Sequence, residues 1–235
     1  TKTETLSIKN TGTTLFDVTA FLHEIRQFKL SPESNEVSTT LAPNEEKTIE
    51  KMIVDCLKIK KYTMDILVAI DSKTTDKTAR AAKRAGARIV YGKGLGKGST
   101  VKSSLPAIKS EYMVQIDADY QFIPKDIPKM IDPLVKGYDV TLGTRYQKGA
   151  QVERGSVSLV KLLGSYFLSF VASLAAGQRV TDVMAGYKGF KTKGLKDLNP
   201  QTKHFGYEAE LVVRAAMRNY KIINPKPFPM DPKDV

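Results

Sequence analysis

The sequence contains little cysteine and no long apolar run. Its single cysteine, Cys56, excludes an internal disulfide and fits a reducing compartment. Cys56 falls within a helical pattern of apolar residues, so we expect it in the core rather than in a catalytic role. The N-terminus lacks the basic-then-apolar order of a secretion signal. No segment reaches the roughly 20 apolar residues of a bilayer span, so we expect no transmembrane segment in this chain.

The longest mainly apolar stretch covers residues 162–176, and three serines interrupt it. It is too short to cross a bilayer and predicts a single helix. Two interpretations stay open: the helix is buried in the core, or one side of it contacts a membrane surface. They differ in where the large apolar side chains of this helix point.

Acidic residues are outnumbered, because 37 lysines and arginines against 25 aspartates and glutamates give a net charge of +12. This charge favours an anionic partner: a phosphorylated substrate, an anionic membrane surface or a nucleic acid. The basic residues are spread along the chain, and no aromatic-basic recognition motif appears. We therefore expect no nucleic-acid partner.

Predicted strands and helices alternate from residue 36 onward, which favours an α/β fold with a mainly parallel central sheet covered by helices on both faces. Polar and turn-forming residues separate these elements. The predicted strands cover residues 37–41, 65–70, 87–91, 112–116, 138–142, 186–191 and 221–224. The predicted helices cover residues 74–84, 100–109, 127–136, 157–176 and 207–219, with one more beginning near Asn44.

We expect one domain over residues 35–224, with a different segment at each end. Residues 1–34 form an N-terminal extension whose role the sequence leaves open, and residues 16–28 within it predict an amphipathic helix. Residues 225–235 contain prolines too densely for regular structure and predict an irregular tail.

The segment Asp117-Ala118-Asp119 is the most informative in the chain. It follows the apolar strand of residues 112–116, so both carboxylates are expected at the carboxyl edge of the sheet, where α/β proteins bind ligands. Two hard oxygen donors at such a place suit Mg²⁺ or Mn²⁺ holding a diphosphate. Two acids that merely open a loop are the alternative, because this short pattern is common.

Polar residues also follow two other predicted strands, at residues 42–46 and 71–76. Together with residues 117–119, and in this order, they resemble the inverting nucleotide-sugar transferases of glycosyltransferase family 2, which have the GT-A fold. Within that family the sequence is most similar to dolichol-phosphate mannose synthases and their polyprenyl-phosphate relatives. The matching stretches are residues 42–46, 71–78, 94–99, 117–121, 143–146 and 182–190.

The resemblance implies a donor site and a metal site. Asp71 would accept hydrogen bonds from the base, or it is only a helix cap. The loop of residues 94–98 would bring Lys97 to phosphate, or it is a flexible basic surface loop. The implied nucleotide-sugar ligands are Pro43, Asn44, Glu45, Asp71, Lys97, Asp117 and Gln121. The implied ligands of Mg²⁺ or Mn²⁺ are Asp117, Asp119 and Gln121.

The resemblance also implies an acceptor site. Arg145 would bind phosphate with its planar guanidinium and act in catalysis beside Asp119, unless it is an unpaired surface arginine. Glu208 and Glu210 are base candidates, but acids in a first helical turn are usually partners of the helix dipole. A lipid phosphate is already ionised, so we assign no general base. The remaining acceptor candidates are Arg154, Lys161 and Asp182.

The function that this resemblance implies is transfer of a hexose from a nucleotide diphosphate sugar to a polyprenyl phosphate, with inversion at the anomeric carbon. The chain would lie peripherally at the cytoplasmic face of a membrane. A soluble family member acting on a small phosphorylated or sugar acceptor is the alternative, and a non-catalytic nucleic-acid-binding module is a lesser one. The nucleotide, the hexose and the oligomeric state stay open, and His23 and His204 are interpreted as structural or surface residues.

Overall fold

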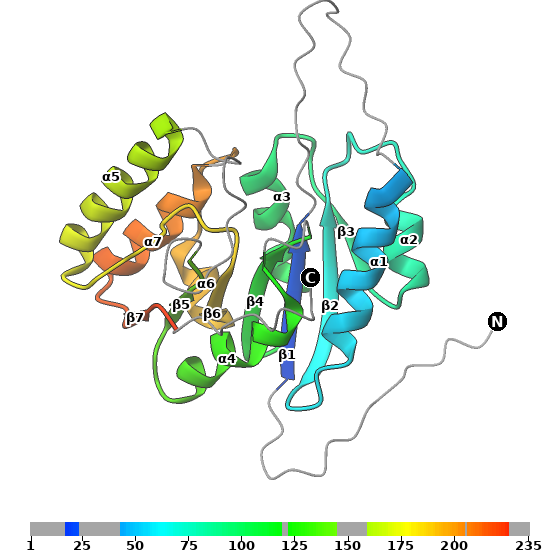
Figure 1. Cartoon of the computed structure of the whole chain (residues 1–235), viewed down its shortest axis with the longest axis horizontal. Helices are drawn as coiled ribbons and strands as arrows, with labels where there is room; N and C mark the ends of the chain where they lie inside the picture. The colour runs from blue at the N-terminus through cyan, green and yellow to red at the C-terminus, as the bar shows by residue number, and fades with distance from the viewer. Residues whose placement is uncertain (1–16, 24–42, 119–121, 145–158, 205, 226–235) are drawn as a thin grey trace, which may run out of the picture.

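One sheet of seven strands forms the centre of the molecule, and helices cover both of its faces (Figure 1). The computed structural model describes residues 17–23, 43–118, 122–144, 159–204 and 206–225. The strand order is β3-β2-β1-β4-β6-β5-β7. The strands are β1 Asp17–His23, β2 Thr63–Ile70, β3 Arg88–Tyr91, β4 Tyr112–Asp117, β5 Val140–Leu142, β6 Lys188–Lys191 and β7 Ile222–Ile223. The helices are α1 Pro43–Leu57, α2 Thr78–Arg84, α3 Lys97–Ser104, α4 Ile127–Val135, α5 Leu159–Ala176, α6 Thr192–Leu198 and α7 Tyr207–Met217.

The sheet is mainly parallel, as the sequence predicts. Strand β1 pairs in parallel with β2 and β4, β2 with β3, and β5 with β7. Among the described strands only β6 is reversed, because it pairs antiparallel with both β4 and β5. The carboxyl ends of the other strands therefore meet along the edge where β2 and β4 finish, which is where the polar segments of the sequence are expected to converge.

Alternation along β2 and β4 divides the core into two layers. Ile66 and Val68 of β2 pack against α1, α2 and α4, whereas Leu67 of β2 and Met113 of β4 pack toward α3, α6 and α7. Both sets are buried because parallel strands are covered by helices on both faces. Cys56 of α1 lies in the first layer and is fully buried, which confirms a core position. Burial, and to a lesser extent Asp55, raises the pKa of its thiol to about 12.

Strand β1 corrects one prediction. The amphipathic helix predicted for residues 16–28 is wrong over Asp17–His23, which form a strand between β2 and β4. The apolar residues of this segment satisfy a helical period as well as a strand, and pairing on both sides decides for the strand. The boundary predicted after residue 34 therefore does not separate these seven residues from the sheet. The strand predicted for residues 37–41 and the tail beyond residue 225 lie outside the described residues.

Two helices begin elsewhere than predicted. Helix α2 begins at Thr78 rather than beside Thr74, because Thr74 is used in a turn in which its amide donates to the Asp71 carbonyl at 2.9 Å. Asp76 accepts from the Thr78 amide at 2.8 Å at the start of α2. Helix α3 begins at Lys97, three residues early, because Gly96 adopts a φ of 95° that leads the chain into the helix. It ends in a 3-10 turn, Leu105–Ala107, around Pro106.

Helix α6 follows β6 directly and was not predicted. Its seven residues include only two buried leucines, Leu195 and Leu198, which is too few for a visible helical period. Helices α4, α5 and α7 and strands β2 to β7 agree with their predicted positions to within a few residues.

Helix α5 occupies the margin of the molecule and packs against α7 (Figure 1). It is the longest described helix, with 18 residues. Across the described ranges, no helix is sufficiently long and apolar to span a bilayer.

Candidate functional site

A buried cluster of charges joins three elements at the carboxyl edge of the sheet. Lys97 is the first residue of α3, Asp117 ends β4, and Glu208 lies in the first turn of α7. The Lys97 ammonium is 2.9 Å from Oδ1 of Asp117 and 2.8 Å from Oε1 of Glu208. The three residues are only 7%, 5% and 3% exposed. A lysine thus links two carboxylates that belong to distant segments of the chain.

Strand alternation directs Asp117 toward α3 and α7. Gln115 is two residues earlier on the same face of β4, and its side-chain amide donates to the hydroxyl of Tyr207 in α7. The ring of Tyr207 in turn lies 5.9 Å from the Lys97 ammonium. Asp117 is buried in an ion pair rather than exposed at the start of a loop, whereas Asp119 lies outside the described residues.

The other side of the Asp117 carboxylate lies against a glycine. A Cβ atom placed on Gly186 would collide with Oδ2 of Asp117, so only glycine allows this approach. Gly98 is restricted in the same way, because a Cβ there would collide with the carbonyl oxygen of Thr202. The backbone is packed so closely around the site that these two positions leave no room for a side chain.

Attraction within the cluster keeps Lys97 charged. Burial disfavours the ammonium, but Tyr207 and the two carboxylates raise the pKa of Lys97 overall. A second lysine, Lys188 of β6, is fully buried nearby and donates to the carbonyl oxygen of Ala185. Burial lowers the pKa of Lys188, although Glu208 and Asp182 oppose that shift by attraction. Asp182 is itself fully buried, so the segment before β6 contributes a carboxyl group to the same interior.

Asp71 connects the end of β2 to the glycine loop of residues 94–98. Its Oδ1 accepts from the Lys73 amide at 3.0 Å, and its Oδ2 accepts from the Gly96 amide at 3.2 Å. It does not cap α2, because that helix begins at Thr78. The glycine loop is also not free on the surface, because Lys97 anchors it in the charged cluster.

The loop of residues 199–204 lies against the glycine loop from the other side. The Ser99 amide donates to the Lys203 carbonyl at 3.0 Å, and a Cβ on Gly96 would meet Nδ1 of His204. His204 is exposed, which confirms its interpretation as a surface residue.

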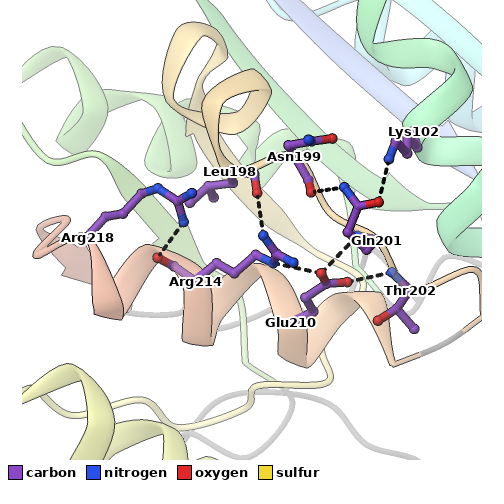
Figure 2. Close-up of polar contacts among 8 residues, drawn as sticks. All are labelled: Lys102, Leu198, Asn199, Gln201, Thr202, Glu210, Arg214 and Arg218. Atoms are coloured by element: carbon purple, nitrogen blue, oxygen red, sulfur yellow. Dashed lines mark hydrogen bonds and ion pairs between the residues drawn. The ribbon is translucent and has the colours of Figure 1, made fainter.

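Glu210 of α7 holds this loop in place, as Figure 2 shows. Its carboxylate accepts from the backbone amides of Gln201 and Thr202 at 2.8 and 2.7 Å, and from Nε of Arg214 at 2.7 Å. Lys102 of α3 donates to the side chain of Gln201 at 3.0 Å. Glu208 and Glu210 therefore both have defined partners within the fold.

The structure brings together four of the predicted site residues: Asp71, Lys97, Asp117 and Asp182. Their elements meet at one edge although they lie far apart in the sequence. The residues Pro43, Asn44 and Glu45 begin α1, and Lys161 belongs to α5, but the described structure does not extend to their side chains. The remaining predictions, Asp119, Gln121, Arg145 and Arg154, lie outside the described residues.

The sequence does not predict the contacts of two buried residues at this edge. It offers Glu208 as a base candidate or a partner of its helix dipole, not as a partner of Lys97, and it gives Lys188 no role. A buried lysine between strands gives no signal of its own in the sequence. The best signal in the sequence is Tyr207, just before Glu208. A large aromatic side chain at the start of a helix tends to be buried, which places the first turn of that helix against the core.

The donor set at the edge is compatible with a hard divalent ion. Asp117 offers carboxylate oxygen, the ligand that Mg²⁺ and Mn²⁺ prefer, at the end of a buried strand. The described residues contain no group of three histidine, cysteine, aspartate or glutamate side chains that could hold a metal by itself. The predicted partners of Asp117 in this role are Asp119 and Gln121.

A mainly parallel sheet with polar and charged groups at its carboxyl edge is the architecture of α/β proteins that bind a ligand there. The chain belongs to glycosyl transferase family 2, whose model matches residues 41–198. The predicted family is confirmed, and with it the class of enzyme, a glycosyltransferase.

Two curated relatives come from the archaeon Haloferax volcanii. The chain is 31% identical over 156 residues to glycosyltransferase AglJ, a match that covers 66% of this chain and 50% of that protein. It is 30% identical over 179 residues to a dolichyl-phosphate hexose transferase, a match that covers 76% of this chain and 75% of that protein. The chain thus spans half the length of the first relative and three quarters of the second.

Among solved structures, the chain resembles glucosyl-3-phosphoglycerate synthase from Mycobacterium tuberculosis in complex with Mn²⁺, UDP-glucose and phosphoglyceric acid. The TM-score is 0.59 at 20% sequence identity, and the match covers 93% of this chain and 74% of that one. This likeness confirms the predicted GT-A fold.

Proposed function

We propose that the chain transfers a hexose from a nucleotide diphosphate sugar to a polyprenyl phosphate at a membrane surface, with Mg²⁺ or Mn²⁺ bound. The observation that carries the acceptor assignment is the apolar outer side of α5. The donor assignment rests on the family, on the edge at which Asp71 and Asp117 follow their strands, and on the UDP-glucose bound to the similar synthase. A dolichyl-phosphate hexose transferase among the relatives supports the lipid acceptor.

The large apolar side chains of α5 that the structure describes point outward. Phe167, Phe170 and Leu174 are 66%, 60% and 68% exposed. The described side chains that α5 buries are small ones, Ser169 and Ala172. This arrangement favours membrane contact over the alternative of a core helix, because a bilayer surface would remove the exposed rings from water. Together with the net charge of +12, which attracts anionic head groups, it supports a peripheral position at the cytoplasmic face.

The proposed reaction is one in-line displacement. An oxygen of the lipid phosphate forms a bond to the anomeric carbon, the bond from that carbon to the diphosphate oxygen breaks, and the nucleoside diphosphate leaves with the electron pair. The configuration at the anomeric carbon is inverted. The acceptor oxygen is already ionised, so the reaction needs no general base, which agrees with the engagement of Glu208 and Glu210 by other partners.

Within this proposal the candidate residues divide into a nucleoside group, a metal group and an acceptor group. Asp71 recognises the nucleoside, with Pro43, Asn44 and Glu45 beside it. Asp117, Asp119 and Gln121 would hold the divalent ion, which when bound neutralises charge on the leaving diphosphate. Arg145 binds the acceptor phosphate near the donor, where Arg154, Lys161 and Asp182 are further acceptor-side candidates.

A transfer assay with two kinds of acceptor tests the proposal. The protein is incubated with Mn²⁺ and radiolabelled UDP- or GDP-hexoses, with either dolichyl phosphate in liposomes or 3-phosphoglycerate in solution. We expect label in the organic phase with dolichyl phosphate. Label only in an aqueous product with phosphoglycerate would favour the soluble alternative, which the phosphoglyceric acid bound to the similar synthase supports.

The metal assignment is tested by Asp119→Ala. We expect this change to abolish transfer while the melting temperature of the metal-free protein stays nearly unchanged. Full transfer by the variant, or by the unaltered protein in the presence of a chelator, would contradict the assignment.

The nucleoside assignment is tested by Asp71→Asn. The change keeps the shape of the side chain and replaces one acceptor oxygen with a donor group, so donor affinity should fall by about 1–3 kcal/mol. Calorimetric titration with UDP- and GDP-hexoses measures this. An unaltered affinity would leave Asp71 as a residue that only ties the glycine loop to β2.

A further inference from the structure

We propose that Glu208 is a positioning residue of the donor site, which acts through Lys97 on the Asp117 carboxylate. The inference rests on the proposed function, because it assigns Asp117 to the divalent ion. Nothing in the sequence resemblance gives Glu208 this role.

The contacts form a continuous chain from α7 to β4. Glu208 accepts from the Lys97 ammonium at 2.8 Å, and the same ammonium donates to Oδ1 of Asp117 at 2.9 Å. All three side chains are more than nine-tenths buried. A lysine on its flexible stem is fixed here by two carboxylates, so removal of one of them allows the ammonium to shift.

Asp117 is held from two sides. Lys97 contacts Oδ1, while Oδ2 lies so close to the backbone of Gly186 that no side chain fits between them. A shift of the ammonium therefore changes the direction in which the carboxylate points toward its ligand. Residues that orient a metal ligand in this way change the affinity of the site although they do not touch the metal.

The cluster also sets the charge that a divalent ion meets. Two carboxylates and one ammonium leave this cluster with a net negative charge, which favours a cation. In Glu208→Gln, the ammonium of Lys97 faces the Asp117 carboxylate alone, and the formal charge of the three side chains becomes zero. Orientation and charge thus act in the same direction, because both weaken cation binding when Glu208 is changed.

Pairing with the dipole of α7 does not account for Glu208 by itself. Glu210 lies in the same first turn and has that position too, yet it accepts from the loop amides and from Arg214. Of these two glutamates, Glu208 is the one that reaches the lysine in contact with the end of β4.

The test is the affinity for Mn²⁺ in the presence of UDP or GDP, measured by the electron paramagnetic resonance of free Mn²⁺. We expect Glu208→Gln to weaken Mn²⁺ binding by about 10- to 100-fold. The matched control is Glu50→Gln on α1, whose carboxylate pairs with Arg84 outside the cluster and which should bind Mn²⁺ as the unaltered protein does.

A double-mutant cycle separates positioning from a merely structural role. If Glu208 acts through Lys97, Glu208→Gln added to Lys97→Gln should cause little further loss of Mn²⁺ affinity. A lowered melting temperature with unchanged affinity of the folded protein would make Glu208 structural and overturn the inference.

Glu208→Asp keeps the charge but shortens the side chain. It provides a second test of the inference, including the case in which Glu208→Gln does not fold. Positioning predicts weaker Mn²⁺ binding than in the unaltered protein, and equal affinity would overturn it. If the unaltered protein fails to bind Mn²⁺ in the presence of either nucleotide, the proposed function fails and the inference with it. If the unaltered protein and the variants bind Mn²⁺ equally well, the inference fails and the proposed function stands.

Discussion

Proteins usually bury apolar side chains and expose charged ones. The charged edge of the sheet and helix α5 depart from this rule in opposite ways. At the edge, the acidic and basic side chains of Lys97, Asp117 and Glu208 are buried and paired with one another. On α5, Phe167 and Phe170 are apolar and exposed. Neither is the arrangement that folding alone would favour, since buried charges lose hydration and exposed rings order water.

The two regions differ in how far their side chains contribute to the stability of the fold. At the edge, Lys97 pairs with both carboxylates, so stability there depends on every member of the cluster. Helix α5 loses nothing within the fold by exposing its rings, because its small buried residues already pack against the molecule. Substitutions at the edge should therefore lower the free energy of unfolding, whereas substitutions of the exposed rings of α5 should change only membrane binding.

The largest effect is expected for Lys97→Met. It leaves two carboxylates buried without their shared cation, so the free energy of unfolding should fall by about 3–5 kcal/mol. Urea denaturation measures the loss. The control is Lys102→Met on the same helix, an exposed position where a change within about 0.5 kcal/mol is expected. Equal stability of the two variants would mean that the buried cluster contributes nothing.

A smaller effect, dependent on pH, is expected for Glu210→Gln. Burial alone would raise the pKa of Glu210, but hydrogen bonds from Thr202, Gln201 and Arg214 lower it below its ordinary 4.5. Because the folded-state pKa is lowered, the stabilisation is present above pH 4.5 and is lost as the pH falls through the folded value. At neutral pH we expect the variant to be less stable by about 1–3 kcal/mol.

Melting temperatures measured from about pH 7 down to about pH 3 test this linkage. The curves of the unaltered protein and of Glu210→Gln should converge as the pH falls below 4.5. A constant separation at every pH would show that the carboxylate charge is not the cause.

The smallest effect on stability is expected on α5. Phe167→Asp should leave the melting temperature nearly unchanged, because the ring is exposed, but it should weaken flotation with anionic liposomes. Leu211→Asp on α7 is the contrasting variant, because it buries a charge in the core and should collapse the melting temperature. Unchanged flotation of Phe167→Asp would remove the main support for a lipid acceptor.

Most of the fold could be predicted because its strongest strands are mainly apolar. Strands β2 and β4 stand out in the sequence since both faces of each are buried. The segment of β1 could not be assigned from its own residues, because its apolar spacing suits a helix and only its two partner strands distinguish the cases. Helix α6 is too short to carry a period of its own.

The candidate site was predictable where its residues end strands. Asp71 and Asp117 follow apolar runs, and that position alone places them at one edge. The partnership of Lys97 with Glu208 could not be predicted, because the two residues are 111 positions apart and each has an ordinary local explanation. Only the packing of α3 against α7 brings them together.

The close approach of Gly186 to Asp117 has a consequence for mutational tolerance. A library that samples every amino acid at position 186 should retain only glycine, because any side chain must displace a carboxylate of the site. Gly164 on α5 is the opposite case, since a Cβ there would meet no atom within 4 Å. Alanine at position 164 should be accepted and should stabilise the helix by about 0.5–1 kcal/mol. The two glycines thus differ in their tolerance to substitution. Position 186 accepts no side chain, whereas a side chain at position 164 increases stability, because only Gly186 faces another group closely.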